Sequence, residues 1–209
     1  LSVLLVTVSV ERRPPWVGGL VAGLLFVTRP EGTLLGALCW VYGVTSELPV
    51  GSPAGAIPGW GDRAAHAVRF SAAFGVGLLL PILPYLAFNV ATSGTFLPNT
   101  YYAKVAVYGR DGLGGLLGFL GEAFAMLSLG PLALLWPGIV AAVVLVARKR
   151  RDLWLIVAWP MVLLFVYAWR LPRVYQYGRY LMPMLPFLIL LGCWGLTELR
   201  SKINMRLLA

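Results

Sequence analysis

The sequence predicts an all-α fold, a polytopic bundle of transmembrane helices. Hydrophobic residues make up 59% of the chain and the mean hydropathy is +0.82, both far above the values of soluble domains. The apolar residues also form uninterrupted blocks of membrane-spanning length, which a soluble core does not require. We therefore expect residues 1–209 to form a single transmembrane domain in a lipid bilayer.

The apolar blocks give the expected helices in order. Residues 1–10 are too short to span a membrane, and the chain starts at Leu1 inside an apolar run, so we expect a fragment with at least one helix upstream. The long loop 92–122 is polar and aromatic, and its glycine-rich part, 109–121, is compatible with a surface helix. The other expected spans are 16–28, 32–45, 67–91, 126–147, 153–169 and 181–196.

Charged residues interrupt the apolar segment 16–45. As one helix, this segment would place Arg29 and Glu31 at mid-membrane, where each charge costs roughly 2.5–3.5 kcal/mol on insertion scales. As two short helices that meet at 29–32, it places both charges at a membrane surface or in a polar cavity. Pro30 removes a backbone donor and Gly32 permits a turn, so the two-helix interpretation is favoured.

With two helices in 16–45, the lysines and arginines divide unevenly between the two sides of the membrane. Eleven of the 17 fall on one side, including the block Arg148–Arg151, and the positive-inside rule makes that side cytoplasmic. With one helix the later loops change sides and the asymmetry disappears. The net charge of +9 therefore reports loop orientation rather than nucleic-acid binding. The other six basic residues are Arg29, Lys104, Arg110, Arg170, Arg173 and Arg179.

Three polar segments, 28–32, 96–111 and 170–180, consequently share the extracytoplasmic face, where we expect them to line one site for an anionic, lipid-linked substrate. Arginine forks and a lysine charge suit phosphate oxygens, and tyrosines stack on sugars and hydrogen-bond hydroxyls. Two alternatives stay open: a structural ion pair between Arg29 and Glu31, and an interfacial aromatic belt made by the tyrosines. The candidate substrate-binding residues are Arg29, Glu31, Asn99, Tyr101, Tyr102, Lys104, Tyr177, Arg179 and Tyr180.

No catalytic constellation accompanies this site. The sequence has no phosphate-cradling glycine loop, no paired carboxylates at helical spacing and no Ser-His-Asp set. Asp111 and Glu122 are the carboxylates of the long loop, and neither pairs with a nucleophile or a second acid. Cys39 and Cys193 lie in apolar runs as small hydrophobes, and His66 has no ligand partner nearby, so no metal site is predicted.

The order Thr28-Arg-Pro-Glu-Gly32, Leu97-Pro-Asn-Thr-Tyr-Tyr-Ala-Lys104 and Tyr177-Gly-Arg-Tyr-Leu-Met-Pro183 resembles the GT-C superfamily of bacterial membrane glycosyltransferases. Within it, the chain is most similar to the actinobacterial arabinofuranosyl- and mannosyltransferase-like proteins. The resemblance covers residues from about 16 to 196. It implies transfer of a hexosyl or pentosyl group from a polyprenyl-phosphate donor to a glycan, lipid or protein acceptor, in cell-envelope synthesis at the plasma membrane.

The resemblance also implies roles for individual residues. It assigns Arg29, Lys104 and Arg179 to the donor phosphate or sugar, with Glu31 orienting Arg29. An acidic residue in the first extracytoplasmic loop is the catalytic base of such enzymes, and we expect it upstream of residue 1. Some branches of the superfamily use a divalent cation, and we predict no cofactor here.

Two other function classes compete with the enzyme. A transporter or flippase for an anionic or lipid-linked substrate fits the broken helix in 16–45, since broken helices are typical of transporters. Transporters bind near the midplane and often carry repeats, whereas these polar residues gather at one face and no repeat is visible. A non-catalytic membrane subunit is the third class, and it would tolerate changes in all three motifs.

Overall fold

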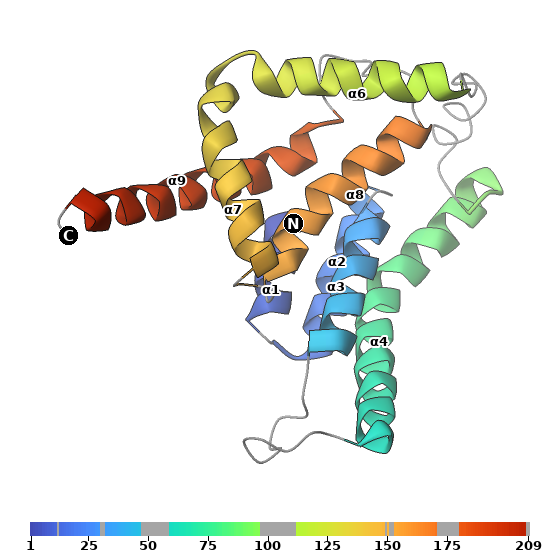
Figure 1. The fold of residues 1–209 in the computed structure, drawn as a ribbon. Helices are drawn as coiled ribbons and strands as arrows, with labels where there is room; N and C mark the ends of the chain where they lie inside the picture. The colour runs from blue at the N-terminus through green and yellow to red at the C-terminus, as the bar shows by residue number, and fades with distance from the viewer. Residues whose placement is uncertain are drawn as a thin grey trace. The chain divides into compact units, whose positions relative to one another are not determined.

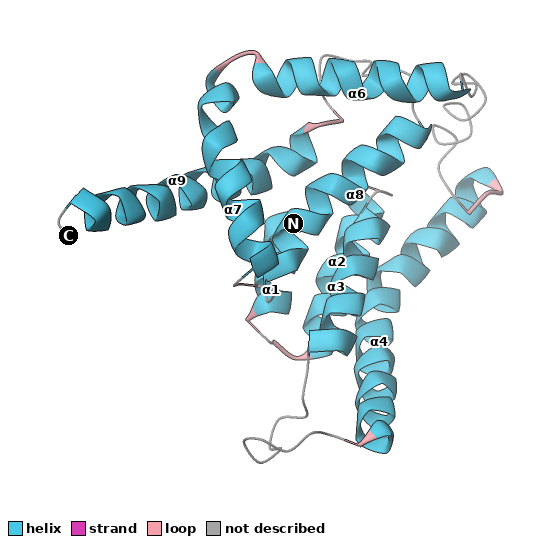
Figure 2. Cartoon of the chain, viewed as in Figure 1, coloured by secondary structure: helices cyan, strands magenta, loops and turns pink. Residues whose placement is uncertain are grey.

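The computed structural model describes residues 1–11, 13–29, 32–46, 59–96, 112–148, 150, 153–170 and 180–207. Of these residues 91% are helical and none lies in a strand, which confirms the all-α class (Figure 2). The chain divides into two compact units, Leu1–Tyr102 and Ala103–Ala209.

Within the described residues, three helices are long and apolar enough to cross a membrane. They are Trp60–Ser93, Pro131–Arg148 and Met182–Ser201. Only 11% of the most apolar window of the first is buried inside the protein, so other described residues cover little of its apolar surface. Shorter apolar helices accompany these three, at Pro15–Thr28, Gly32–Thr45, Leu117–Ser128 and Trp154–Trp169. This composition supports association with a membrane.

Unit 1 contains the helices α1 (Ser2–Val10), α2 (Pro15–Thr28), α3 (Gly32–Ser46) and α4 (Trp60–Ser93). α2 starts with a proline at its first position, where the missing N–H costs nothing. It ends at Thr28, because Arg29 adopts an extended backbone with φ −150° and ψ 119°. α3 then begins at Gly32, so the helix breaks where the two-helix interpretation of 16–45 places the break.

α2 and α4 touch backbone to backbone through glycines. A Cβ built on Gly77 of α4 would lie 2.9 Å from the backbone nitrogen of Leu20, and one on Gly19 of α2 would lie 2.9 Å from the nitrogen of Leu78. A Cβ on Gly23 would lie 2.6 Å from the ring of Pro81. Gly19 and Gly23 form the small-xxx-small spacing that lets membrane helices approach closely.

The same contacts fix the directions of the helices in unit 1. Gly19 meets Phe74, Gly23 meets Pro81, and the Phe26 ring lies 6.1 Å from that of Tyr85, so α2 and α4 run parallel. α3 runs opposite to both. Its first residue, Gly32, packs on Leu25 of α2, and near its end Gly43 and Trp40 meet the start of α4. There the Trp40 Nε1 donates to the Ser71 Oγ at 2.9 Å.

α4 is longer than an apolar membrane layer requires. Its 34 residues extend about 51 Å at 1.5 Å per residue, against a hydrocarbon core of about 30 Å. Its first turns carry Asp62, Arg63, His66 and Arg69, so the charged residues of this helix gather at its N-terminal end. The helix continues through the two interior prolines and bends along its length (Figure 1).

Unit 2 contains the remaining described elements. They are α6 (Gly112–Ser128), η1 (Pro131–Leu135), α7 (Trp136–Arg148), α8 (Trp154–Arg170), η3 (Met182–Met184) and α9 (Leu185–Leu207). The expected span 126–147 divides in the structure, because α6 continues to Ser128 and η1 starts at Pro131. Gly130, at φ +123°, makes the corner between them, and this backbone conformation strongly favours glycine.

Glycines also join α7 and α9 within unit 2. A Cβ on Gly195 of α9 would lie 2.6 Å from the carbonyl carbon of Gly138 and 3.0 Å from the nitrogen of Ala142, both in α7. α9 continues to Leu207, beyond the expected span 181–196. Beside it, α8 packs Trp159 into the core, where its Nε1 donates to the Pro183 carbonyl at 3.4 Å.

Candidate functional site

Arg29 lies at the junction of α2 and α3 rather than inside a helix. Its backbone N–H donates to the Leu25 carbonyl at 2.8 Å, and its own carbonyl accepts from the Gly32 N–H at 2.8 Å. These two bonds complete the last turn of α2 and start α3. The side chain is half-buried at the C-terminus of α2, where the partial negative charge of the helix end favours a cation.

Arg29 shares one end of unit 1 with the last turns of α4. The two helices run parallel, and Phe26 of α2 is level with Tyr85 of α4. Three residues further along each helix, Arg29 after α2 is level with about Phe88 and Asn89 of α4. α4 ends five residues later, where Gly94 adopts a left-handed conformation at φ +67° and turns the chain away. This end of the unit therefore holds Arg29 and the start of the segment that continues to Lys104.

Asn89 is the one buried polar or charged residue among those described, with 7% of its surface exposed. Its side-chain Nδ2 donates to the backbone carbonyl of Phe96 at 3.1 Å. The backbone carbonyl of Asn89 accepts from the Ser93 Oγ at 2.8 Å. The side-chain amide thus connects the chain after Gly94 to the last turn of α4. Sequence reasoning did not single out Asn89, although an asparagine inside the apolar block 67–91 was a visible signal.

The other described arginines of unit 1, and its one histidine, lie at the opposite end. Arg13 precedes α2, and Arg63, His66 and Arg69 occupy the first turns of α4. Arg13 pairs with Glu11 through an exposed contact of 3.4 Å, the kind of surface ion pair that contributes little. Among the described arginines of unit 1, Arg29 thus lies at one end of the unit and the others lie at the opposite end.

Tyr180 belongs to unit 2 and is packed into its core. Only 8% of the residue is exposed, and its ring lies 5.3 Å from the ring of Tyr167 in α8 at an angle of 60°. Buried aromatic pairs of this geometry stabilise a fold beyond their buried area. The contact gives Tyr180 a packing role at the point where the chain enters η3.

The other candidate residues lie outside the described residues. These are Glu31, Asn99, Tyr101, Tyr102, Lys104, Tyr177 and Arg179. The structure thus locates two of the nine candidates, Arg29 in unit 1 and Tyr180 in unit 2. In the described part of the chain, no three His, Cys, Asp or Glu side chains gather as metal ligands would. No family model matches the sequence, and no curated protein or solved structure matches the chain.

Proposed function

We propose that this chain is part of an integral-membrane glycosyltransferase with a polyprenyl-phosphate-linked sugar as its donor. In this proposal, the Arg29 end of unit 1 holds the donor phosphate, and the acceptor is an extracytoplasmic glycan, lipid or protein. The observation that carries the proposal is the position of Arg29, which lies at a helix break beside the end of α4. The three motifs that resemble GT-C enzymes add the expectation that Lys104 and Arg179 also bind the donor.

The surface beside Arg29 suits a lipid-linked anion. Leu83 and Phe88 near the end of α4 are 58% and 64% exposed, so exposed apolar side chains of this helix reach the level of the arginine. A polyprenyl chain can lie against such side chains while its phosphate meets the guanidinium at the end of the unit. Guanidinium groups bind phosphate through two parallel N–H···O bonds, which a lysine at the same position cannot reproduce.

The proposed reaction is a substitution at the anomeric carbon of the donor sugar. The acceptor hydroxyl oxygen forms the new bond to that carbon, the bond from carbon to phosphate oxygen breaks, and a base takes the hydroxyl proton. Polyprenyl phosphate leaves with the electron pair and an added negative charge, which a neighbouring cation stabilises in the transition state. Arg29 is assigned to that charge, and no residue of 1–209 is assigned as the base.

Transport of a lipid-linked anion is the second candidate function. The break between α2 and α3 favours it, because discontinuous helices line the substrate sites of many transporters. The location of Arg29 argues against it, since the arginine lies at one end of unit 1 rather than half-way along its helices.

A transfer assay with the protein in liposomes tests the proposal. The donor is a radiolabelled polyprenyl-phosphate sugar from the native membrane, and the readout is label joined covalently to an acceptor. Arg29→Ala is expected to lower the transfer rate by roughly 10–100-fold. This decrease corresponds to the loss of a charge-assisted contact of about 1.5–3 kcal/mol. Arg29→Lys should recover only part of it, because the bidentate geometry is missing.

Arg13→Ala is the matched control, an arginine at the opposite end of the same helix in an exposed pair. It should transfer sugar at the normal rate. Equal rates for Arg29→Ala and the unmodified protein would remove Arg29 from the donor site. Uptake of the labelled lipid with no covalent product would instead favour transport.

A further inference from the structure

The surface of α6 has a composition unlike that of an ordinary water-exposed helix. Its 17 residues include one charged side chain, Glu122. One side of the helix packs inward on α8 and η1, through Phe119, Ala123 and Leu127, which are at most 8% exposed. Leu117 and Phe124, in contrast, are 66% and 63% exposed.

The exposed residues of α6 divide into two flanks. Leu117 and Phe124 are seven residues apart, two turns, and lie on one flank of the inward side. Gly118 and Glu122 are four residues apart and lie on one side of the helix. At about 100° per residue, this side is more than 100° around the helix axis from Leu117 and Phe124. Met126, 40% exposed, follows Glu122 by about one turn on the same flank. α6 therefore presents an apolar flank, formed by Leu117 and Phe124, and a charged flank around its one charge, Glu122, with its packed side between them.

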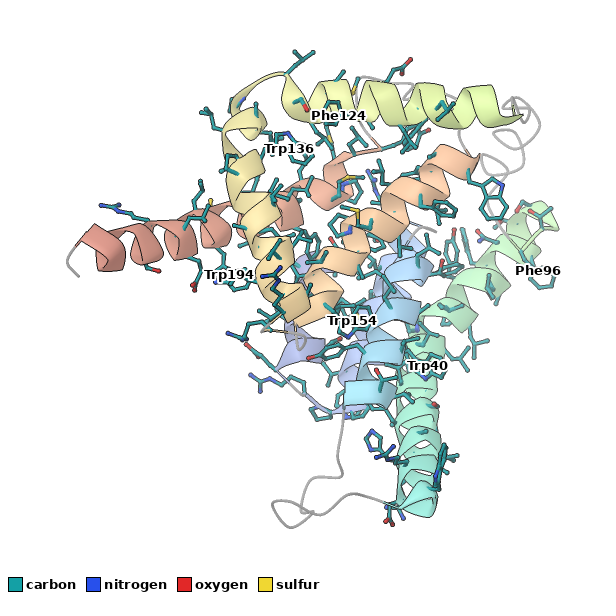
Figure 3. All side chains as sticks on the ribbon, viewed as in Figure 1. Trp40, Phe96, Phe124, Trp136, Trp154 and Trp194 are labelled. Carbon is teal, nitrogen blue, oxygen red and sulfur yellow. The ribbon has the colours of Figure 1, made fainter. Side chains whose placement is uncertain are left out.

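The aromatic contact at the corner identifies what the apolar flank faces. The Phe124 ring lies 5.9 Å from the ring of Trp136, the first residue of α7, so this flank of α6 turns toward the side from which α7 leaves (Figure 3). Figure 1 shows α6 lying crosswise to α7. η1 and α7 form one of the three helices able to cross a membrane.

Exposed apolar side chains also lie at the corner and along that candidate span. Leu129 and Leu134 at the corner are 78% and 77% exposed, and Val140 in α7 is 58% exposed. α6 thus has an apolar flank next to the exposed apolar side chains of η1 and α7. One occupant fits this arrangement, the interfacial layer of the bilayer. Helices that lie in this layer bury their apolar side among acyl chains and keep their charges toward water.

We propose that α6 is a membrane-surface helix that inserts Leu117 and Phe124 below the lipid headgroups and holds Glu122 toward water. Trp136 then lies at the same boundary, a depth that tryptophan favours. α6 fixes the depth at which α7 enters the bilayer, because the Gly130 corner and the Phe124–Trp136 contact join the two helices. This inference is independent of the proposed enzymatic activity.

Depth-dependent fluorescence quenching tests it in the full chain. Cys39 and Cys193 are replaced by alanine, and single cysteines are introduced as Leu117→Cys and Phe124→Cys, each carrying an environment-sensitive fluorophore. The protein is reconstituted in phosphatidylcholine vesicles that contain a nitroxide quencher either near the headgroup or near the chain end. Aqueous iodide reports exposure to water.

Two matched positions calibrate the result. Gly118→Cys is the neighbouring residue on the charged flank, where a Cβ meets nothing within 4 Å, and Val140→Cys lies on the exposed side of α7. We expect the labels at 117 and 124 to be quenched best by the shallow nitroxide, with a blue shift and loss of iodide quenching. The label at 118 should be quenched mainly by iodide, and the label at 140 best by the deep nitroxide.

Two outcomes would overturn the inference. Equal iodide quenching at 117 and 118, with no effect of either nitroxide, would place both flanks of α6 in water. Protection of 117 and 124 from iodide and from both nitroxides would mean that protein, either unit 1 or a second copy, covers the apolar flank. A normal signal at 140 in each case shows that the labelled chain is folded and inserted.

Discussion

Gly77 offers the sharpest test of the helix packing in unit 1. A Cβ at this position would lie 2.9 Å from both the Leu20 nitrogen and the Trp16 carbonyl carbon, whereas ordinary contacts begin near 3.4 Å. These neighbours are backbone atoms, so no side-chain rotation can relieve the overlap and α2 must move away from α4. Overpacking of this kind costs about 1–3 kcal/mol, and we expect Gly77→Ala to destabilise unit 1 by about that amount.

Gly75, two residues earlier in the same helix, is the matched control. A Cβ there would meet nothing within 4 Å, so Gly75→Ala brings only the higher helix propensity of alanine, worth about 0.5–1 kcal/mol. The two substitutions have the same chemistry and opposite expected signs. The measurement is thermal unfolding in detergent, followed by near-UV circular dichroism and tryptophan fluorescence.

A change of 1 kcal/mol shifts the midpoint of a domain of 60–100 residues by roughly 4–8 °C, which makes the expected difference between the two variants easy to resolve. Gly77→Ala should melt several degrees below the unmodified protein and Gly75→Ala at or above it. If both variants shift equally, or if Gly77→Ala is the more stable, the close α2–α4 contact does not exist in the folded protein.

Three further predictions address the other packing contacts and the orientation of α4. Gly195→Ala should lower the unfolding midpoint of unit 2, while Gly121→Ala, whose Cβ meets nothing within 4 Å, should leave it unchanged or raise it. Trp40→Phe removes an interhelical hydrogen bond to α4 and should cost about 0.5–1.5 kcal/mol in the same assay; an unchanged midpoint would show that this bond contributes nothing. In a background without native cysteines, Gly61→Cys should react with an impermeant maleimide only from the cytoplasmic side and Ser93→Cys only from outside; the reverse pattern would invert the predicted topology.

The break at Arg29 could be predicted because its causes are local. A charged pair with high insertion cost, a proline without an N–H and a glycine that permits a turn all lie within 29–32, and each disfavours a continuous helix. The break at Gly130 was missed, although the Gly130–Pro131 dipeptide is a strong breaker. The uniform apolarity of 126–147 concealed it, since hydropathy averages over a window and is insensitive to a corner between two apolar helices.

The contacts between helices could not be predicted in the same way. Gly19 and Gly77 matter because of the backbone that lies opposite each of them, and the sequence does not state which helices are neighbours. For the tyrosines, the sequence left an aromatic belt and a substrate site as alternatives, and it gave no sign of the ring contact that Tyr180 makes with Tyr167. The role of Asn89 could not be read from charge patterning, because its neutral amide connects α4 to the following segment through a hydrogen bond to the Phe96 carbonyl.

The most direct test of the central claim is binding of a polyprenyl phosphate to the purified protein, measured by native mass spectrometry in detergent with farnesyl phosphate as the probe. We predict that Arg29→Ala weakens this binding by roughly 10–100-fold, the effect of losing a charge-assisted phosphate contact of about 1.5–3 kcal/mol. Arg13→Ala, at the other end of α2, should bind as the unmodified protein does. If Arg29→Ala binds farnesyl phosphate as tightly as Arg13→Ala does, the assignment of the donor phosphate to the Arg29 end of unit 1 is contradicted.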